Sequence, residues 1–169
     1  MLDASASTNA YISLGSNLGD RAGNLLLAIR GMLDAGLPVS RVSQIYETEP
    51  VETFAQPLFL NMVAELQVNT LLKPEEVLTR LLQVEHLLGR TRDLQKGPRT
   101  IDLDLLLYGD QTRDCELLTL PHPRLHLRRF VLVPLAELAP QLVHPALNQT
   151  VAELLRALAD VSKVKQWNP

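Results

Sequence analysis

The spacing of the apolar residues changes along this chain in a fixed order, and that order limits the possible folds more than any other feature. Apolar residues at every second position are typical of strands, and apolar residues three and four positions apart are typical of helices. Strands are predicted at 10–15, within 39–50, at 58–68 and at 100–108, and helices at 20–33 and 74–88. The order β-α-β-β-α-β predicts a ferredoxin-like core, in which both helices cover one face of an antiparallel sheet.

The chain beyond residue 110 predicts further cover for this sheet. Residues 116–120 are expected to add an edge strand, and residues 128–139 and 150–160 to be helical, the first despite Pro134. The predicted fold class is therefore α/β (α+β), a three-layer sandwich with helices on both faces of the sheet. We expect a flexible N-terminal lead at 1–9, a single domain at 10–160 and a C-terminal tail at 161–169.

Composition and charge argue against several classes of protein. Apolar residues make up 46% of the 169 residues, which is enough for one hydrophobic core. A net charge of −3 gives no overall basic surface, so we expect no nucleic-acid partner. No apolar run approaches the roughly 20 residues of a membrane span, and Cys115 is the only cysteine, so no internal disulfide forms. A cytoplasmic protein without a membrane partner is expected.

The segment GPRTIDLDLLLYGD at 97–110 contains two aspartates, although it otherwise predicts a buried strand, where aspartate is depleted. Asp102 and Asp104 are two positions apart, which puts both carboxylates on one strand face, about 6.6 to 6.8 Å apart. At an effective dielectric constant near 20 the two charges repel by about 2.5 kcal/mol, so a cation is expected between them. Magnesium is the natural candidate because it binds one or two carboxylates together with phosphate and water. The alternative is a solvated strand face, where the repulsion falls well below about 1 kcal/mol.

Two groups of basic residues lie close to this acidic strand in the sequence. The first consists of Arg90, Arg92, Lys96 and Arg99, and the second of His122, Arg124, His126, Arg128 and Arg129. Guanidinium groups match phosphate oxygens bidentately, so both groups suit a polyphosphate with its metal. The alternative is a solvated loop paired with surface acids, and each histidine alone is more often structural. Neither a Walker A nor a G-x-G-x-x-G motif occurs, and Gly15 and Gly19 are expected in turns, so phosphate binding would depend on side chains and metal.

Several motifs together resemble one known family. They are YISLGSNLGD at 11–20, YETEP at 46–50, FLN at 59–61, GRTR at 89–92, GPRTIDLDLL at 97–106 and LPHPRL-x-x-R-x-FVL-x-PL at 120–135. In this order they resemble 6-hydroxymethyl-7,8-dihydropterin pyrophosphokinase of folate biosynthesis, over about residues 10 to 158. The pattern G-P-R-T-x-D-x-D is the most specific part.

The resemblance implies a magnesium-dependent enzyme that transfers pyrophosphate from its co-substrate ATP to the pterin hydroxymethyl group and releases AMP. It implies that Asp102 and Asp104 hold two magnesium ions, and that Arg90 and Arg99 reach the phosphates from a mobile loop. The residues implied on the ATP side are His122, Arg128, Arg92 and Leu105. On the pterin side they are Phe59 and Phe130, whose rings sandwich the pterin, Asn61, which reads its edge, and the segment of Thr48 and Val51. Without the resemblance, each phenylalanine would be assigned to core packing.

A few positions depart from the family pattern. Many relatives carry an aromatic residue preceded by a basic one where this chain has Gln95 and Lys96, so the loop is expected to seal the site differently or less tightly. Glu49 stands where relatives can carry proline, and Leu127 where glutamate is frequent. None of these changes removes a metal ligand or a matched arginine.

Two other interpretations compete with the enzyme. One is a non-catalytic nucleotide- or ligand-binding module on a ferredoxin-like scaffold, and the other is a nucleic-acid binder with basic loops. A pure binder has no need of two metal-binding carboxylates beside the arginines, and the acidic net charge argues against nucleic acid. We therefore expect a monomer whose partners are its small-molecule substrates.

Overall fold

The computed structural model describes residues 6–51, 55–90 and 97–169. Its main sheet is antiparallel, in the order β5-β1-β4-β3-β8, with β2 also paired to β4. The strands of this sheet are β1 (Ser7–Ser16), β2 (Val39–Val42), β3 (Tyr46–Thr48), β4 (Phe59–Asn69), β5 (Asp102–Tyr108) and β8 (Val164–Gln166). A separate hairpin is formed by β6 (Arg113–Asp114) and β7 (Thr119–Leu120). The helices are α1 (Arg21–Asp34), α2 (Pro74–Leu87), α3 (Arg129–Leu138) and α4 (Val151–Ala157), with a 3₁₀ turn at Leu125–Leu127.

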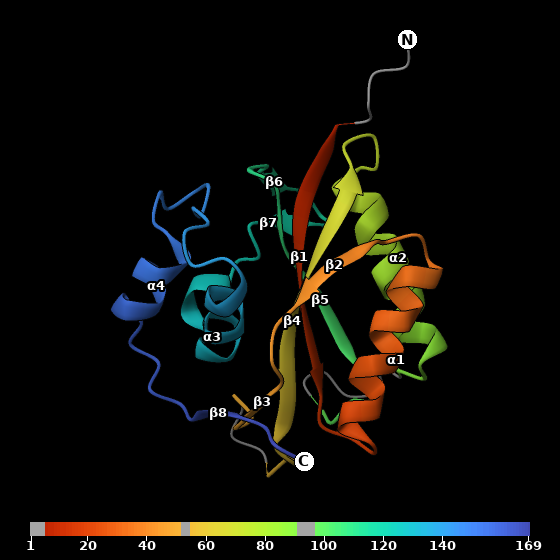
Figure 1. The fold of residues 1–169 in the computed structure, drawn as a ribbon, viewed down its shortest axis with the longest axis vertical. Helices are drawn as coiled ribbons and strands as arrows, with labels where there is room; N and C mark the ends of the chain where they lie inside the picture. The colour runs from red at the N-terminus through yellow and green to blue at the C-terminus, as the bar shows by residue number, and fades with distance from the viewer. Residues whose placement is uncertain (1–5, 52–54, 91–96) are drawn as a thin grey trace.

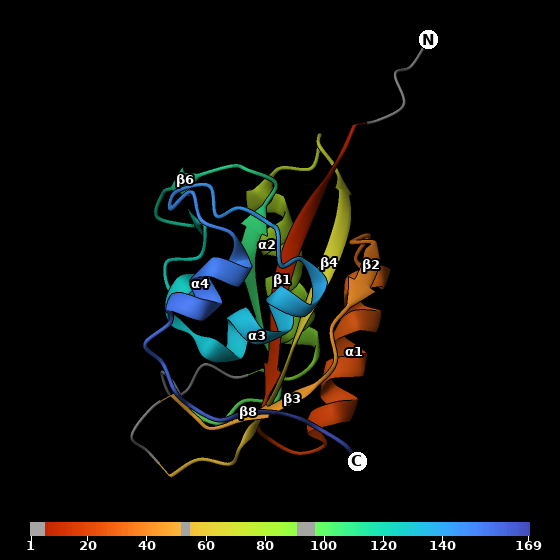
Figure 2. The same ribbon diagram turned by 60° about the vertical axis from the view of Figure 1, so that its left-hand side comes forward.

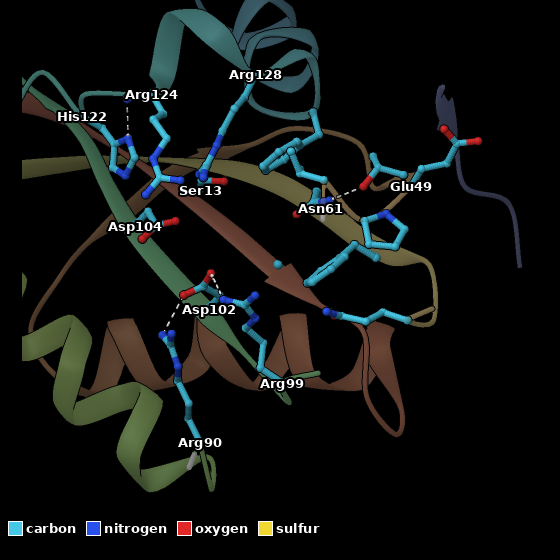
Figure 3. Close-up of a pocket in the computed structure, with 17 residues that line it drawn as sticks. Ser13, Glu49, Asn61, Arg90, Arg99, Asp102, Asp104, His122, Arg124 and Arg128 are labelled. Atoms are coloured by element: carbon cyan, nitrogen blue, oxygen red, sulfur yellow. Dashed lines mark hydrogen bonds and ion pairs between the residues drawn. The ribbon is translucent and has the colours of Figure 1, made fainter. Parts of the chain in front are cut away.

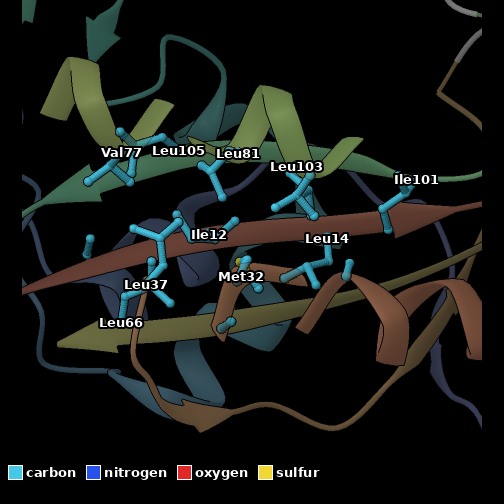
Figure 4. Packing of buried hydrophobic residues seen from close by; sticks show 14 of the residues in the cluster. Ile12, Leu14, Met32, Leu37, Leu66, Val77, Leu81, Ile101, Leu103 and Leu105 are labelled. Atoms are coloured by element: carbon cyan, nitrogen blue, oxygen red, sulfur yellow. The ribbon is translucent and has the colours of Figure 1, made fainter. Parts of the chain in front are cut away.

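The sheet lies between two layers of helices (Figure 1), with α1 and α2 on one face and α3 and α4 on the other. The larger core fills the space between the sheet and the first pair, where Leu14, Met32 and Leu81 pack together (Figure 4). The smaller core joins the other sheet face to α3 and α4. The predicted three-layer class is confirmed, and β5, β1, β4 and the β2/β3 edge supply the strand order of a ferredoxin-like unit.

Local signals set the ends of the first two helices. The Asp20 carboxylate accepts a hydrogen bond from the backbone N–H of Gly23 at 3.0 Å and so caps α1. Pro74 occupies the first position of α2, and the Glu76 carboxylate accepts from the backbone N–H of Lys73 at 2.9 Å. Gly89 follows α2 with a φ of +80°, a conformation that glycine adopts without strain. Both helices match their predicted ranges to within one residue.

A bulge in β5 changes which face its side chains take. Ile12 of β1 lies opposite Leu105 and Tyr11 lies opposite Leu107, so Leu106 is an extra residue on β5. As a result Leu106 and Leu107 both pack in the smaller core, while Leu103, Leu105 and Tyr108 pack in the larger one. Asp102 and Asp104, which alternate with Leu103 and Leu105, therefore lie on the same sheet face as α3.

Two strands differ from their predicted bounds. β1 begins at Ser7, inside the segment expected to be a flexible lead, because Ser7 pairs with Asn69 at the end of β4. The strand predicted within 39–50 is two short strands, since the Ser43 hydroxyl accepts from the backbone N–H of Val63 and interrupts the ladder.

The C-terminal part also differs. Residues 164–166, expected in a tail, form β8 against β3. The strand expected at 116–120 contributes only Thr119–Leu120, which pairs with β6 instead of the main sheet. The pairing of β8 depends on a partner far away in the chain, and both β7 and β8 are too short to leave a periodic signal in the local sequence. The division of the chain into domains stays a prediction.

Within the described residues, no helix combines the length and the apolar character that crossing a membrane requires.

Candidate active site

A pocket of about 250 Å³ opens on the sheet face that α3 covers only in part. At one end of this face, Tyr11, Val63 and Leu106 pack under α3 and α4. At the other end the same strands carry polar side chains into the pocket (Figure 3). The lining residues are Ser13, Gly15, Thr48, Glu49, Pro50, Val51, Gln56, Phe59, Asn61, Arg90, Arg99, Asp102, Asp104, His122, Arg124, Arg128 and Phe130.

The pocket brings together nearly all of the residues predicted for the site. Leu105 is not part of the lining, because its side chain is buried in the larger core. Arg92 lies outside the described residues, as do Gln95 and Lys96. Val51 is at the rim and exposed.

Some lining residues carried too little signal for the sequence to single them out. Ser13 lies opposite Asp104 in the β1–β5 ladder, and it belongs to the YISLGSNLGD motif without a predicted role of its own. Gly15, expected in a turn, is the partner of Asn61 in the β1–β4 ladder. A Cβ at Gly15 would lie 2.7 Å from Asn61 Oδ1, so the absent side chain makes room for the amide. Pro50 and Gln56 come from the connection between β3 and β4; Pro50 ends the YETEP motif without a predicted role, and Gln56 belongs to no motif.

Asp102 is held by two arginines. Arg90 Nη1 lies 2.7 Å from one carboxylate oxygen, and Arg99 Nη1 lies 3.2 Å from the other. Arg90 also pairs with Glu85, a buried carboxylate of α2 that accepts from the backbone N–H of Leu103 at 2.7 Å. The negative charge of Asp102 is therefore balanced within the protein.

Asp104 is in a different electrostatic position. The described residues give its carboxylate no hydrogen bond or ion pair. Burial and the neighbouring Asp102 raise the pKa of Asp104, and Arg128 opposes this shift. In Figure 3, Arg124 and Arg128 extend toward Asp104 from one side, while Arg90 and Arg99 reach Asp102 from the other. A half-buried carboxylate without a hydrogen bond or ion pair among the described residues leaves a place for a cation.

The donor set at this place suits a hard divalent cation. No group of three or more histidine, cysteine, aspartate or glutamate side chains converges among the described residues, so a closed all-protein metal site is not formed there. Two carboxylates in an open pocket match magnesium, which keeps several positions for water and phosphate.

Two aromatic rings also line the pocket, each beside an arginine. Arg99 Cζ is 5.6 Å from the centroid of the Phe59 ring, and Arg128 Cζ is 5.4 Å from that of Phe130. Both distances are within the range of about 6 Å for cation–π attraction. The pocket thus combines a charged end with flat apolar surfaces.

Asn61 is oriented by a neighbouring strand. Its Nδ2 donates to Thr48 Oγ1 at 2.6 Å, and both side chains are buried. This bond fixes which way the amide points and leaves Oδ1 as an acceptor, so the edge of a planar heterocycle could pair with it.

His122 is neutral at physiological pH. Burial, followed by the charges of Arg128 and Arg124, lowers the pKa of His122 to about 4. Its Nδ1 accepts from the backbone N–H of Arg124 at 3.2 Å, so the ring carries its proton on Nε2. His122 therefore offers a hydrogen-bond donor without a charge.

Comparison with known proteins identifies the family that the sequence motifs resemble. The family described as 7,8-dihydro-6-hydroxymethylpterin-pyrophosphokinase (HPPK) matches residues 11–140. The 2-amino-4-hydroxy-6-hydroxymethyldihydropteridine pyrophosphokinase of Bacillus subtilis is 44% identical over 160 residues, covering 94% of this chain and 95% of the relative. The folic acid synthesis protein fol1 of Pneumocystis carinii is 43% identical over 150 residues, covering 89% of this chain. This chain spans only 20% of that fungal protein.

Solved structures share the fold at low sequence identity. The HPPK-DHPS of Plasmodium falciparum with SDX-DHP superposes with a TM-score of 0.72 at 15% identity. The match covers 91% of this chain and 45% of the parasite chain. The arrangement of helices and strands is therefore that of a known fold.

Proposed function

Since the chain belongs to the 7,8-dihydro-6-hydroxymethylpterin pyrophosphokinase family, we propose that the pocket described above is where the reaction of this family takes place. The activity is pyrophosphoryl transfer from ATP to 6-hydroxymethyl-7,8-dihydropterin, a step of folate biosynthesis. The observation that carries the assignment is Asp104, a half-buried carboxylate with no hydrogen bond or ion pair among the described residues, next to an aspartate that already pairs with two arginines.

Asp102 and Asp104 would hold magnesium, with two ions expected on the triphosphate. When bound there, magnesium supplies positive charge beside both the attacking and the leaving oxygens of the displacement. The fit is supported by the two carboxylates on one strand face and by the unbalanced charge of Asp104. Arg90 and Arg99, which pair with Asp102 in the structure, lie where they could turn toward a bound triphosphate.

The arginines would then contact the phosphates. In the reaction the pterin hydroxymethyl oxygen bonds to the β-phosphorus, the bridging oxygen between the α- and β-phosphorus leaves with AMP, and the hydroxyl proton is released. Arg90 and Arg99 would stabilise charge on the transferred group, while His122 and Arg128 would bind the ATP side. Arg92 belongs to this proposal through its sequence motif alone, and Leu105 would contribute only backbone atoms. Positioning and electrostatics do most of the work in such transfers.

The pterin would bind beside the two aromatic rings of the pocket. Phe59 and Phe130 offer ring faces, and the amide of Asn61 offers an oriented donor and acceptor. Arg99 and Arg128 now lie beside these rings, so the phosphates would draw the same arginines away from the faces that the pterin needs. Thr48 would hold Asn61, and Val51 would close the rim.

A single assay tests the whole assignment. Purified protein is incubated with ATP, magnesium chloride and 6-hydroxymethyl-7,8-dihydropterin, and AMP and the pterin diphosphate are quantified by chromatography. Equal amounts of both products, formed only when all three components are present, are expected. A protein that binds ATP and pterin but forms no AMP would instead be a non-catalytic binding module.

A monomer working in the cytoplasm is part of the same proposal. Light scattering after size-exclusion chromatography is expected to give a mass near 18.8 kDa. A measured mass of twice that value would contradict the prediction of a monomer.

A further inference from the structure

The last ten residues of the chain, 160–169, are attached to both walls of the pocket without lining it. We call them the C-terminal segment. In Figure 2 the chain leaves α4, runs past the beginning of α3 and reaches the sheet edge beside β3.

The first attachment is made by Asp160. One oxygen of its carboxylate accepts from the backbone N–H of Arg129 at 3.0 Å, and the other accepts from that of Ser162 at 2.8 Å. Arg129 is the first residue of α3, and Arg128 before it provides no side-chain cap. The first N–H groups of a helix need partners, and a carboxylate there also interacts well with the helix dipole. Asp160 therefore caps α3 from a distant part of the chain, at the turn that carries Arg128 and Phe130.

The second attachment is β8. Thr48 of β3 pairs with Val164 and Tyr46 pairs with Gln166, and the backbone N–H of Trp167 donates to the Ile45 carbonyl at 2.8 Å. β3 has only three residues, so β8 provides one of the two neighbours that hold it. Thr48 is the residue that accepts from Asn61.

The opposite end of α3 is tied to the same edge. The Glu137 carboxylate accepts from the backbone N–H of Gln44 at 3.0 Å and from the Tyr46 hydroxyl at 2.7 Å. Helix α3 is thus fixed relative to β3 at both ends, directly through Glu137 and through the C-terminal segment at its start.

We propose that the C-terminal segment sets the spacing between the two walls of the pterin subsite, with Asp160 as the positioning residue for Phe130 and β8 as the support of Thr48 and Asn61. The inference rests on the assignment of this pocket to the pterin. Loss of β8 loosens only the Thr48 wall, whereas loss of the Asp160 carboxylate loosens the wall that carries both Phe130 and Arg128. The two changes should therefore affect the KM values for the pterin and for ATP differently.

Two variants, one without β8 and one without the Asp160 carboxylate, distinguish the two effects. A chain ending at Lys163 retains Asp160 and Ser162 but lacks β8, and it is expected to raise the KM for the pterin about tenfold with a KM for ATP within about twofold of the parent. Asp160→Ala is expected to raise both KM values, each about fivefold or more, while kcat changes less. Pterin binding is also measured by calorimetry with a non-hydrolysable ATP analogue, below the unfolding temperature of each variant.

Matched controls exclude a general loss of stability. Thr150→Ala removes the cap of α4, which lines no part of the pocket, and Trp167→Ala removes packing against the core while keeping the β8 backbone. Both are expected to lower the unfolding temperature with KM values within about twofold of the parent. An unchanged pterin KM in the shortened chain, or an equal rise in Thr150→Ala, would overturn the inference. A parent protein that forms no AMP would instead refute the proposed function.

Discussion

Asp102 and Asp104 lie two residues apart on one strand but have opposite surroundings. Two arginines neutralise Asp102, whereas Asp104 is half-buried beside that first carboxylate and has no hydrogen bond or ion pair among the described residues. The motif alone could not predict this difference, because it depends on where Arg90 and Arg99 point. The asymmetry suggests that Asp104 is the residue whose charge most needs the metal.

Replacing Asp104 with asparagine should separate activity from stability. Because the pKa of Asp104 is raised in the folded state, its ionised form destabilises the fold once the pH exceeds the pKa of the unfolded chain, about 3.9. Asp104→Asn should therefore raise the free energy of unfolding near neutral pH by about 1 kcal/mol, and this gain should disappear on acidification. Turnover should fall more than about 100-fold. Urea unfolding across pH, without metal, checks the first part, and AMP formation checks the second.

Arg99→Ala should lower kcat about 100-fold and change the pterin KM little. The reason is that its guanidinium, now shared between Asp102 and the Phe59 ring, is expected to meet the transferred group. Steady-state kinetics with each substrate varied in turn gives both constants. Arg30→Ala, which breaks an exposed ion pair on α1, is the control. A large rise in the pterin KM at constant kcat would contradict this role.

Phe130→Ala should have the reverse effect, weakening pterin binding about tenfold through lost stacking. Because Phe130 lines the pocket and packs only partly against the smaller core, the loss of stability should be moderate. Calorimetric titration with the pterin and an ATP analogue measures the change. Undiminished affinity would show that this ring does not contact the pterin.

At the level of strands and helices, an element is predictable from the sequence when its signals are local, and it is not when it depends on a partner far away in the chain. Helices α1 and α2 follow from periodicity and from the start signals at Asp20 and Pro74, so both were predictable. The bulge at Leu106 and the pairing of β8 were not, because each depends on a partner far away in the chain. Among the residues that line the pocket, the family motifs predicted both aromatic residues and most of the charged ones, whereas Ser13 and Gln56 lack distinctive chemistry.

The β1–β4 register makes Gly15 a sensitive position. Since a Cβ there would press on Asn61 Oδ1, Gly15→Ala should turn the amide away from its bond with Thr48. We expect pterin affinity to fall about tenfold while the free energy of unfolding changes by about 1 kcal/mol. Calorimetry and urea unfolding measure the two quantities, with Ser7→Ala at the far end of β1 as control. Unaltered pterin binding would mean that the amide adapts.

For the molecule as a whole, ligand binding should increase the stability of the folded protein. A ligand that binds only the folded protein stabilises it by about 2.7 kcal/mol at 100 times its dissociation constant. Because Asp104 needs a cation, ATP with magnesium should raise the unfolding temperature more than ATP with EDTA does. The Asp104→Asn variant should lose most of this difference, and differential scanning fluorimetry is the measurement. Equal shifts with and without magnesium would argue against a metal at this strand.

The bulge in β5 separates two parts of the strand that have different roles. Before Leu106 the strand presents acids to the pocket, and after it two consecutive leucines anchor the layer beneath α3. Deleting Leu106 would restore a regular alternation in which Leu107 and Tyr108 keep their present layers, but the smaller core would lose one of its two consecutive leucines. The extra residue thus gives the layer beneath α3 two neighbouring leucines directly after the acidic part of the strand, where a regular strand would supply only one.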